Sequence, residues 1–286
     1  MISIREVFTR ALKFGIFIVS FLFLLTSCLP EQKIANTLIQ SPPEINILVF
    51  APEVVFKYNH KGEMIPGFDS IGDAQQDSAL WVESSYVQYL NDSLLLEKYI
   101  NSFINELRLL GFNVYLDNSI DSFLIGKPQS YVWNIAQIQV DEYLYPLEDE
   151  EPFQDTVYYK RFDLNAVDFS CWFELSKVNA EKAHKLTLYS SFTAYDNFEG
   201  EFYLDPWEMD MKYKYRLDSL QVKDVTEMAV YSGRKHAAYL YDYFLNQFIA
   251  ARLPKGQTMY YYYHYNRQKK SVSPTDDTGF EVIEPK

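Results

Sequence analysis

Acidic residues surround a tryptophan in residues 205–210. Asp205, Glu208 and Asp210 all lie within three positions of Trp207. Two carboxylates a few ångströms apart can serve as the acid and the base or nucleophile of glycoside hydrolysis, and an indole ring beside them can stack on a sugar. The same pattern is typical of a surface turn that carries one half-buried tryptophan. We expect the turn, and the pair Asp205 and Glu208 remains the alternative site of a carboxylate-dependent hydrolase.

Histidines and other acidic residues offer no spacing that suits a metal ion. The four histidines are His60, His184, His236 and His264, and no two are spaced as metal ligands usually are. We expect His236, which follows two basic residues, to face solvent. The acidic run 148–151 lacks the glycine and alternate-residue spacing of a calcium loop, so we expect a solvated loop. With no nucleotide-binding or nucleophile-elbow motif present, the sequence predicts no catalytic residue, no metal and no cofactor.

Aromatic residues are dense, with 24 Tyr, 21 Phe and 4 Trp in 286 residues. One run near the C-terminus could stack on sugar rings or pair with a protein edge. It could equally form a strand that covers an edge of the domain itself, and the sequence leaves both open. The candidate binding residues are Trp207, Tyr260, Tyr261, Tyr262 and Tyr263.

The N-terminal segment is typical of a secretory signal. Three basic residues, Arg5, Arg10 and Lys13, precede a short apolar run at residues 14–25. That run is shorter than the roughly 20 residues that a membrane-spanning helix requires. Small residues and then Cys28 follow it, as at a cleavage site. The alternative is an uncleaved N-terminal anchor in which the cysteine is incidental.

Leu25-Thr26-Ser27-Cys28 resembles the lipobox of bacterial lipoproteins. The resemblance implies that Leu25, Thr26 and Ser27 are recognised by the signal peptidase. It also implies that the Cys28 thiol receives diacylglycerol and that the new amino terminus is acylated, for example with palmitate. Several acyl chains together give stable membrane attachment. Leu29, in place of an aspartate after the cysteine, favours the outer membrane. The absence of an acidic run after it favours the periplasmic face, with the cell surface as the alternative.

Charge and cysteine content limit the function further. The chain has 26 basic and 39 acidic residues and a net charge of −13, which argues against nucleic acid as a partner. With Cys28 lipidated, Cys171 has no disulfide partner within the chain. Because Cys171 lies in an apolar run without a nearby base, we expect a buried, unreactive thiol.

Hydrophobic periodicity predicts one α+β domain over residues 45–253. Residues 93–110 form the clearest helix, because apolar residues recur there at steps of three and four and Gly111 follows. Strands are expected at residues 45–58, 112–116, 130–145, 158–175 and 185–203, and a second long helix at 224–253. The remaining segments are a signal peptide at 1–27, the lipidated cysteine and a tether at 28–44, and a Tyr-rich segment with a flexible tail at 254–286. We expect a mostly antiparallel sheet with the two long helices on one face.

The order of these elements is similar to that of small envelope lipoproteins that serve larger machines. The nearest pattern is the auxiliary lipoprotein of ABC-type lipid transport systems, and the lipopolysaccharide-assembly lipoprotein shares the plan. The matching segments are 94–110 with Gly111-Phe112-Asn-Val-Tyr, 135–143, 166–175 and a closing helix that ends near Phe248. The resemblance implies a non-enzymatic, membrane-anchored accessory with an envelope protein as partner. A surface glycan-binding lipoprotein and the hydrolase are the alternatives.

Overall fold

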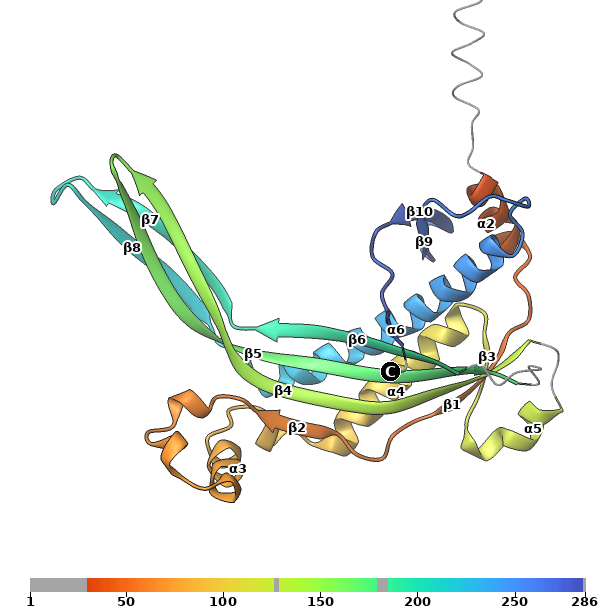
Figure 1. Ribbon diagram of the computed structural model, residues 1–286, viewed down its shortest axis with the longest axis horizontal. Coiled ribbons are helices and arrows are strands. Elements are labelled where there is room, and N and C mark those ends of the chain that lie inside the picture. The colour runs from red at the N-terminus through yellow and green to blue at the C-terminus, as the bar shows by residue number, and fades with distance from the viewer. Residues whose placement is uncertain (1–29, 126–128, 179–184, 285–286) are drawn as a thin grey trace, which may run out of the picture. The chain divides into compact units, whose positions relative to one another are not determined.

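A computed structural model describes residues 30–125, 129–178 and 185–284 (Figure 1). The predicted signal peptide, its recognition residues, Cys28 and His184 therefore lie outside the described residues. The described residues divide into two compact units, one within 44–241 together with 278–284 and one of residues 30–43 with 242–277. Within the described ranges, no helix is both long enough and apolar enough to cross a membrane.

The larger unit contains a seven-stranded sheet in the order β11-β6-β5-β4-β1-β3, and β2 also pairs with β4. Its strands are β1 (Asn46–Phe50), β2 (Phe56–Asn59), β3 (Asn113–Tyr115), β4 (Ser130–Phe153), β5 (Thr156–Lys177), β6 (Lys185–Tyr195) and β11 (Glu281–Ile283). The α+β class is confirmed. The expected mostly antiparallel sheet is wrong, because β1 runs parallel to both β3 and β4, and β2 runs parallel to β4. A helical crossover between β1 and β3 makes their parallel pairing possible.

Helices α3 (Asp73–Val82), α4 (Asp92–Leu109), α5 (Ile120–Leu124) and the start of α6 (Val222–Ala250) belong to the same unit. Short 3₁₀ turns lie at Gly62–Met64, Phe68–Ser70, Val87–Tyr89 and Asp117–Ser119. The helix predicted at 93–110 is α4. The side chain of Asn91 accepts a hydrogen bond from Leu94 N at its start. Gly111, at φ 95°, follows its end in the left-handed conformation.

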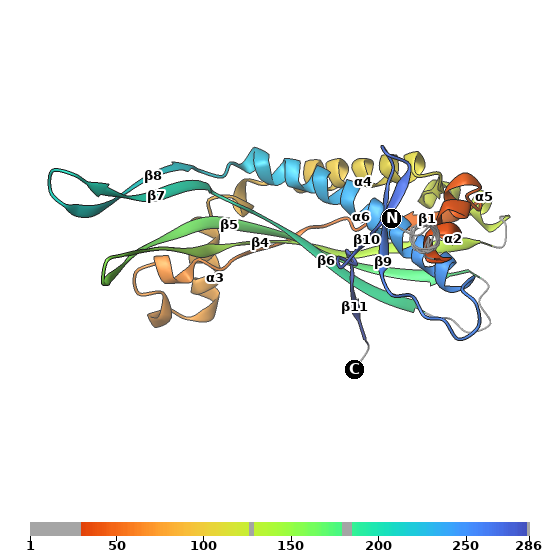
Figure 2. The same cartoon turned by 90° about the horizontal axis from the view of Figure 1, so that it is seen from above.

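Both long helices pack on one face of the sheet, as predicted (Figure 2). The Tyr99 ring of α4 lies 5.5 Å from the buried Phe169 of β5, and the His236 ring of α6 lies 4.9 Å from the buried Phe173. Gly233 permits the close crossing of the helices, because a Cβ there would lie 2.5 Å from the carbonyl oxygen of Tyr99. The two helices therefore form one layer over a shared aromatic core.

Cys171 and His236 are both fully buried in this core. The buried thiol was predicted, and burial raises its pKa. The expectation of a solvent-exposed His236 was wrong, because the basic neighbours Arg234 and Lys235 point elsewhere around the helix. His236 Nδ1 lies 2.9 Å from the hydroxyl of Tyr99. Burial lowers the pKa of His236 to about 3, so the imidazole is neutral at ordinary pH.

The C-terminal residues do not form the flexible tail that the sequence predicted. β11 pairs antiparallel with β6. The Phe280 ring is buried 5.6 Å from Trp133 and 5.4 Å from Phe173. A single aromatic residue in an otherwise polar segment is a weak sequence signal, yet its burial fixes the segment on the larger unit.

The smaller unit combines α2 (Pro30–Gln40), the end of α6 and a hairpin of β9 (Tyr262–Asn266) with β10 (Ser271–Thr275). Asn246 fixes the hairpin by donating to the Tyr263 carbonyl and accepting from the Tyr263 amide. The predicted tether at 28–44 is thus helical over 30–40. The predicted domain at 45–253 begins one residue from the start of the larger unit, but its C-terminal end differs, because the division falls within α6, at residue 242.

Candidate functional site

The sheet of the larger unit branches into two ribbons beyond one end. β2 pairs with β4 only as far as Glu142, and β5 pairs with β6 only as far as Ala166. Past these points β4 and β5 continue as a two-stranded ribbon. A second ribbon forms from β7 (Asn197–Asp205) and β8 (Asp210–Asp218). We call residues 143–165 and 197–218 the arm. Both of its ribbons reach past the ends of α4 and α6 (Figures 1 and 2).

The first ribbon includes the acidic run that the sequence analysis placed in a loop. Pro146 and residues 148–151 belong to β4 and pair with β5 in continuous register, so that expectation was wrong. The carbonyl of Glu142 accepts from His60 N, on the side away from β5. Pro146 and Pro152 follow Glu142 by four and ten positions, and alternate residues of a strand direct their backbone groups to the same edge. They therefore lie on the same open edge, where a proline removes no ladder hydrogen bond.

Apolar faces of the two ribbons pack against each other. The Phe162 ring of β5 lies 4.5 Å from Phe198, 5.6 Å from Tyr213 and 5.0 Å from Tyr215. The hydroxyl of Tyr213 donates to a carboxylate oxygen of Asp149 at 2.8 Å. These contacts join the two ribbons around Phe162 and Asp149.

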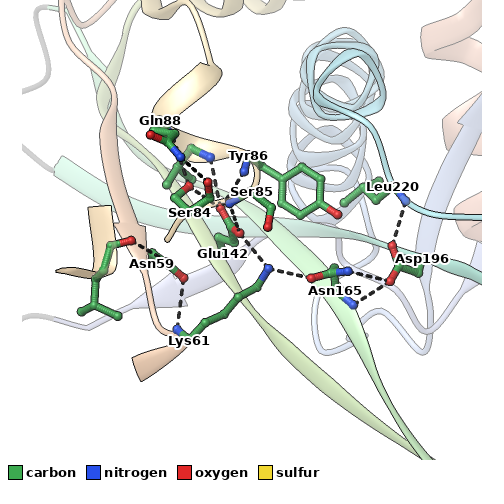
Figure 3. A network of polar contacts seen from close by, with 12 residues as sticks. Asn59, Lys61, Ser84, Ser85, Tyr86, Gln88, Glu142, Asn165, Asp196 and Leu220 are labelled. Atoms are coloured by element: carbon green, nitrogen blue, oxygen red, sulfur yellow. Dashed lines mark hydrogen bonds and ion pairs between the residues drawn. The ribbon is translucent and has the colours of Figure 1, made fainter. Parts of the chain in front are cut away.

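Asp196 ties both strands of the second ribbon to β5 at the branch point (Figure 3). One of its carboxylate oxygens accepts from the backbone and side-chain nitrogens of Asn165, each at 2.9 Å. The other oxygen accepts from Leu220 N at 2.8 Å. Asp196 precedes β7 and Leu220 follows β8, so one buried side chain fixes both ends of the ribbon.

A buried ion pair extends this network to β4. The ammonium of Lys61 donates to Glu142 Oε1 and to Asn165 Oδ1, both at 2.7 Å (Figure 3). Lys61 and Glu142 are almost entirely excluded from solvent. We call Lys61, Glu142, Asn165 and Asp196 the polar brace, because their side chains form one continuous chain of hydrogen bonds across the base of the arm.

The Glu142 carboxylate is fully occupied by hydrogen-bond donors. The loop before α4 supplies Ser84 Oγ at 2.7 Å and the backbone nitrogens of Ser85, Tyr86 and Val87 at 2.8, 2.9 and 3.1 Å. Burial alone would raise the pKa of Glu142, but the bonds from Lys61 and these donors outweigh it, and the pKa is lowered. Because the Glu142 carboxylate is ionised, buried and fully hydrogen-bonded, its role is to position the segments that donate to it. We therefore assign the polar brace to holding the arm.

The polar brace was not predicted from the sequence, although one signal for it was present. Glu142 continues the series Ile138 and Val140, whose side chains are on the buried face of β4. A carboxylate at an apolar position of a strand indicates a buried partner. The partner, Lys61, is 81 residues away in the sequence, and no spacing rule links the two.

The far end of the second ribbon holds the acidic cluster around Trp207. A turn is present as predicted, but the expectation that Trp207 is half-buried was wrong, because the residue is 94% exposed. The ammonium of Lys212 donates to Asp205 at 2.6 Å and pairs with Glu208 at 2.8 Å. This bond from Lys212 and two backbone amides lower the pKa of Asp205. A lowered pKa is the opposite of what a general acid requires.

The four tyrosines of the C-terminal run separate in the smaller unit. Tyr260 and Tyr261 are exposed, while Tyr262 and Tyr263 belong to β9 and Tyr263 is fully buried. The second half of the run is therefore a strand, but among the described residues it pairs with β10 in a separate two-stranded sheet and covers no edge of the larger sheet. Tyr260 and Tyr261 are accessible to a ligand.

A cavity of about 890 Å³ lies beside His60 in the larger unit. Its lining includes Asn59, His60, Ile65, Phe68, Asp69 and Leu80. His60 Nε2 lies 3.0 Å from Asp141, whose carboxylate also accepts from Gln139. The size is in the range of small-molecule sites. Among the described residues, no three metal-ligand side chains gather.

Comparison of the sequence with protein-family models and with curated proteins gave no match.

Proposed function

We propose that this protein is a lipid-anchored, non-enzymatic accessory of a cell-envelope transport or assembly complex. In this proposal Cys28 carries the lipid, the outer membrane holds the anchor, and the folded part faces the periplasm. The arm is the surface that binds the envelope protein partner. The observation that carries the proposal is the arm itself, two packed ribbons that project from the sheet on a buried polar brace.

Exposed apolar side chains on the arm support the assignment. They are Tyr145, Val157, Tyr159, Tyr203, Leu204, Trp207, Met209, Tyr215 and Leu217. Concentrations of exposed apolar residues rimmed by charges are typical of protein interaction sites. An arm without a function would be expected to become shorter during evolution, because open strand edges promote aggregation.

The N-terminal sequence supports the anchor and the location. A basic segment, a short apolar run and Leu25-Thr26-Ser27-Cys28 follow one another in the order of a lipoprotein signal. The element order expected from the sequence also resembles that of envelope accessory lipoproteins. These features motivate an extracytoplasmic partner.

Photo-crosslinking in intact cells tests the proposal. A photoreactive amino acid at Tyr159 or at Tyr215, one on each ribbon, should yield a discrete adduct with one envelope protein. The matched control is position Leu109, which has the same exposure as Tyr159, 60%, but lies at the end of α4. Equal labelling at Leu109 and at the two arm positions, or no protein adduct at any of them, would overturn the proposal.

Glycan binding is the second candidate, and the exposure of Trp207 is the observation that favours it. A flat indole ring open to solvent can stack on a sugar ring. A screen of the purified protein against cell-surface polysaccharides decides this point. Binding that is lost in Trp207→Ala, together with a failure of protein crosslinking, would replace the accessory role.

A further inference from the structure

We propose that the turn between β7 and β8 inserts Trp207 into an apolar pocket on the protein partner, and that basic residues surround this pocket. The inference rests on the proposed function, since it specifies how the arm recognises its partner. Three observations lead to it: the ordered turn, the exposure of its apolar side chains and the charge of the arm.

Bonds within the turn hold its backbone in one conformation. One oxygen of Asp205 accepts from Trp207 N at 2.9 Å and from Glu208 N at 3.3 Å, and the backbone oxygen of Asp205 accepts from Met209 N at 2.8 Å. Lys212 fixes the other carboxylate oxygen. Met209 adopts φ 53°, a conformation that non-glycine residues occupy only when their surroundings impose it.

This fixed backbone presents apolar side chains to water. Trp207 is 94% exposed and Met209 is 73% exposed, at the end of a ribbon whose other large apolar residues are more covered. A turn held this firmly loses little conformational entropy on binding. Tryptophan is one of the residues enriched at the energetic centre of protein interfaces, and methionine is enriched in interfaces in general.

The charge of the arm indicates what kind of partner surface can receive Trp207. Residues 143–165 and 197–218 contain twelve acidic and five basic side chains. Glu148, Glu150 and Glu151 form no ion pair with any residue in the described part of the chain. An acidic arm repels anionic lipid headgroups and attracts a basic protein surface. The occupant is therefore a protein pocket with lysine or arginine around it.

The experiment measures binding of the full lipidated chain, in detergent, to the partner identified by crosslinking at Tyr159 and Tyr215. Trp207→Ala should weaken binding by at least about thirtyfold, the effect of an interface hot spot, while Trp207→Phe should retain most of it. The control is Tyr89→Ala, which removes an aromatic side chain that is 65% exposed and lies outside the arm, and this variant should bind as the wild type does. Added salt should weaken wild-type binding, because the charged rim is screened.

A photoreactive amino acid at position 207 identifies the site on the partner that the turn contacts. Its adduct should map to apolar partner residues with lysine or arginine close by. If the partner crosslinks to Tyr159 and Tyr215 but binds Trp207→Ala unchanged, this inference fails and the accessory role stands. Adducts from position 207 with lipid or glycan alone would also overturn it. If no partner is captured at any arm position, the proposed function and the inference fail together.

Discussion

Replacing Glu142 with glutamine should strongly destabilise the larger unit. The substitution keeps the shape of the side chain but removes the charge that balances the buried Lys61, and the new amide group brings its own N–H donors among the donors that face the carboxylate. Removing one partner of a buried ion pair typically reduces stability by about 3–5 kcal/mol. A protein of ordinary stability has about 5–15 kcal/mol in total, so the loss is large.

Removal of the other partner of the ion pair, by Lys61→Met, should reduce the stability less. The Glu142 carboxylate would keep Ser84 Oγ and three backbone amides as donors. We expect a loss of about 2–3 kcal/mol, because hydrogen bonds from the loop continue to stabilise the charge. The double variant Lys61→Met with Glu142→Gln should be more stable than Glu142→Gln alone, since no buried charge is left and the glutamine oxygen can still accept from the loop.

Urea unfolding followed by tryptophan fluorescence measures these differences, because Trp133 is buried in the core of the same unit. Hydrogen exchange at the amide of Leu220, which donates to Asp196, reports on the base of the arm. Losses below about 1 kcal/mol for both single variants would refute the reasoning. That result would mean that water reaches the pair and that the polar brace does not hold the arm.

Three further outcomes follow from the sequence and the core. Gly233→Ala, although favourable for a helix in isolation, should destabilise the protein by about 1–3 kcal/mol in thermal unfolding, because its Cβ would press on the backbone of Tyr99 and Phe103. The pKa of His236 is lowered to about 3, against 6.5 in the unfolded chain, so only the unfolded state gains this proton as the pH falls below 6.5. The free energy of unfolding should then decrease by about 1.4 kcal/mol per pH unit. His236→Phe should flatten that slope between about pH 6 and 5. Cys28→Ala should abolish incorporation of labelled palmitate and release the protein from the membrane fraction; retained label would exclude lipidation at that residue.

Local signals account for what the sequence predicted well. The helix at 93–110 could be located because Asn91 caps its start, Gly111 follows its end and its apolar spacing is regular. The buried Cys171 could be expected from its apolar neighbours. These features depend on residues within one or two helical turns, where physical rules act on sequence alone.

Features that depend on long-range pairing could not be predicted. Proline and four consecutive acids suggested a loop at 146–151, but an open strand edge tolerates both. The two ribbons meet through Phe162 and Phe198, which belong to different hairpins. Parallel pairing of β1 with β4 likewise joins strands that are separated by α4. Only the three-dimensional structure shows which distant segments are neighbours, so the arm could not be predicted from the sequence.

The central claim is that the arm binds an envelope protein, and affinity purification from solubilised envelopes tests it most directly. The wild type should be compared with Tyr159→Glu/Tyr215→Glu, which places charges on both ribbons, and with Leu109→Glu, which places one on α4. We expect the partner to be recovered with the wild type and with Leu109→Glu, and to be lost with the arm variant at equal protein levels. Equal recovery of the same partner with all three proteins would contradict the claim.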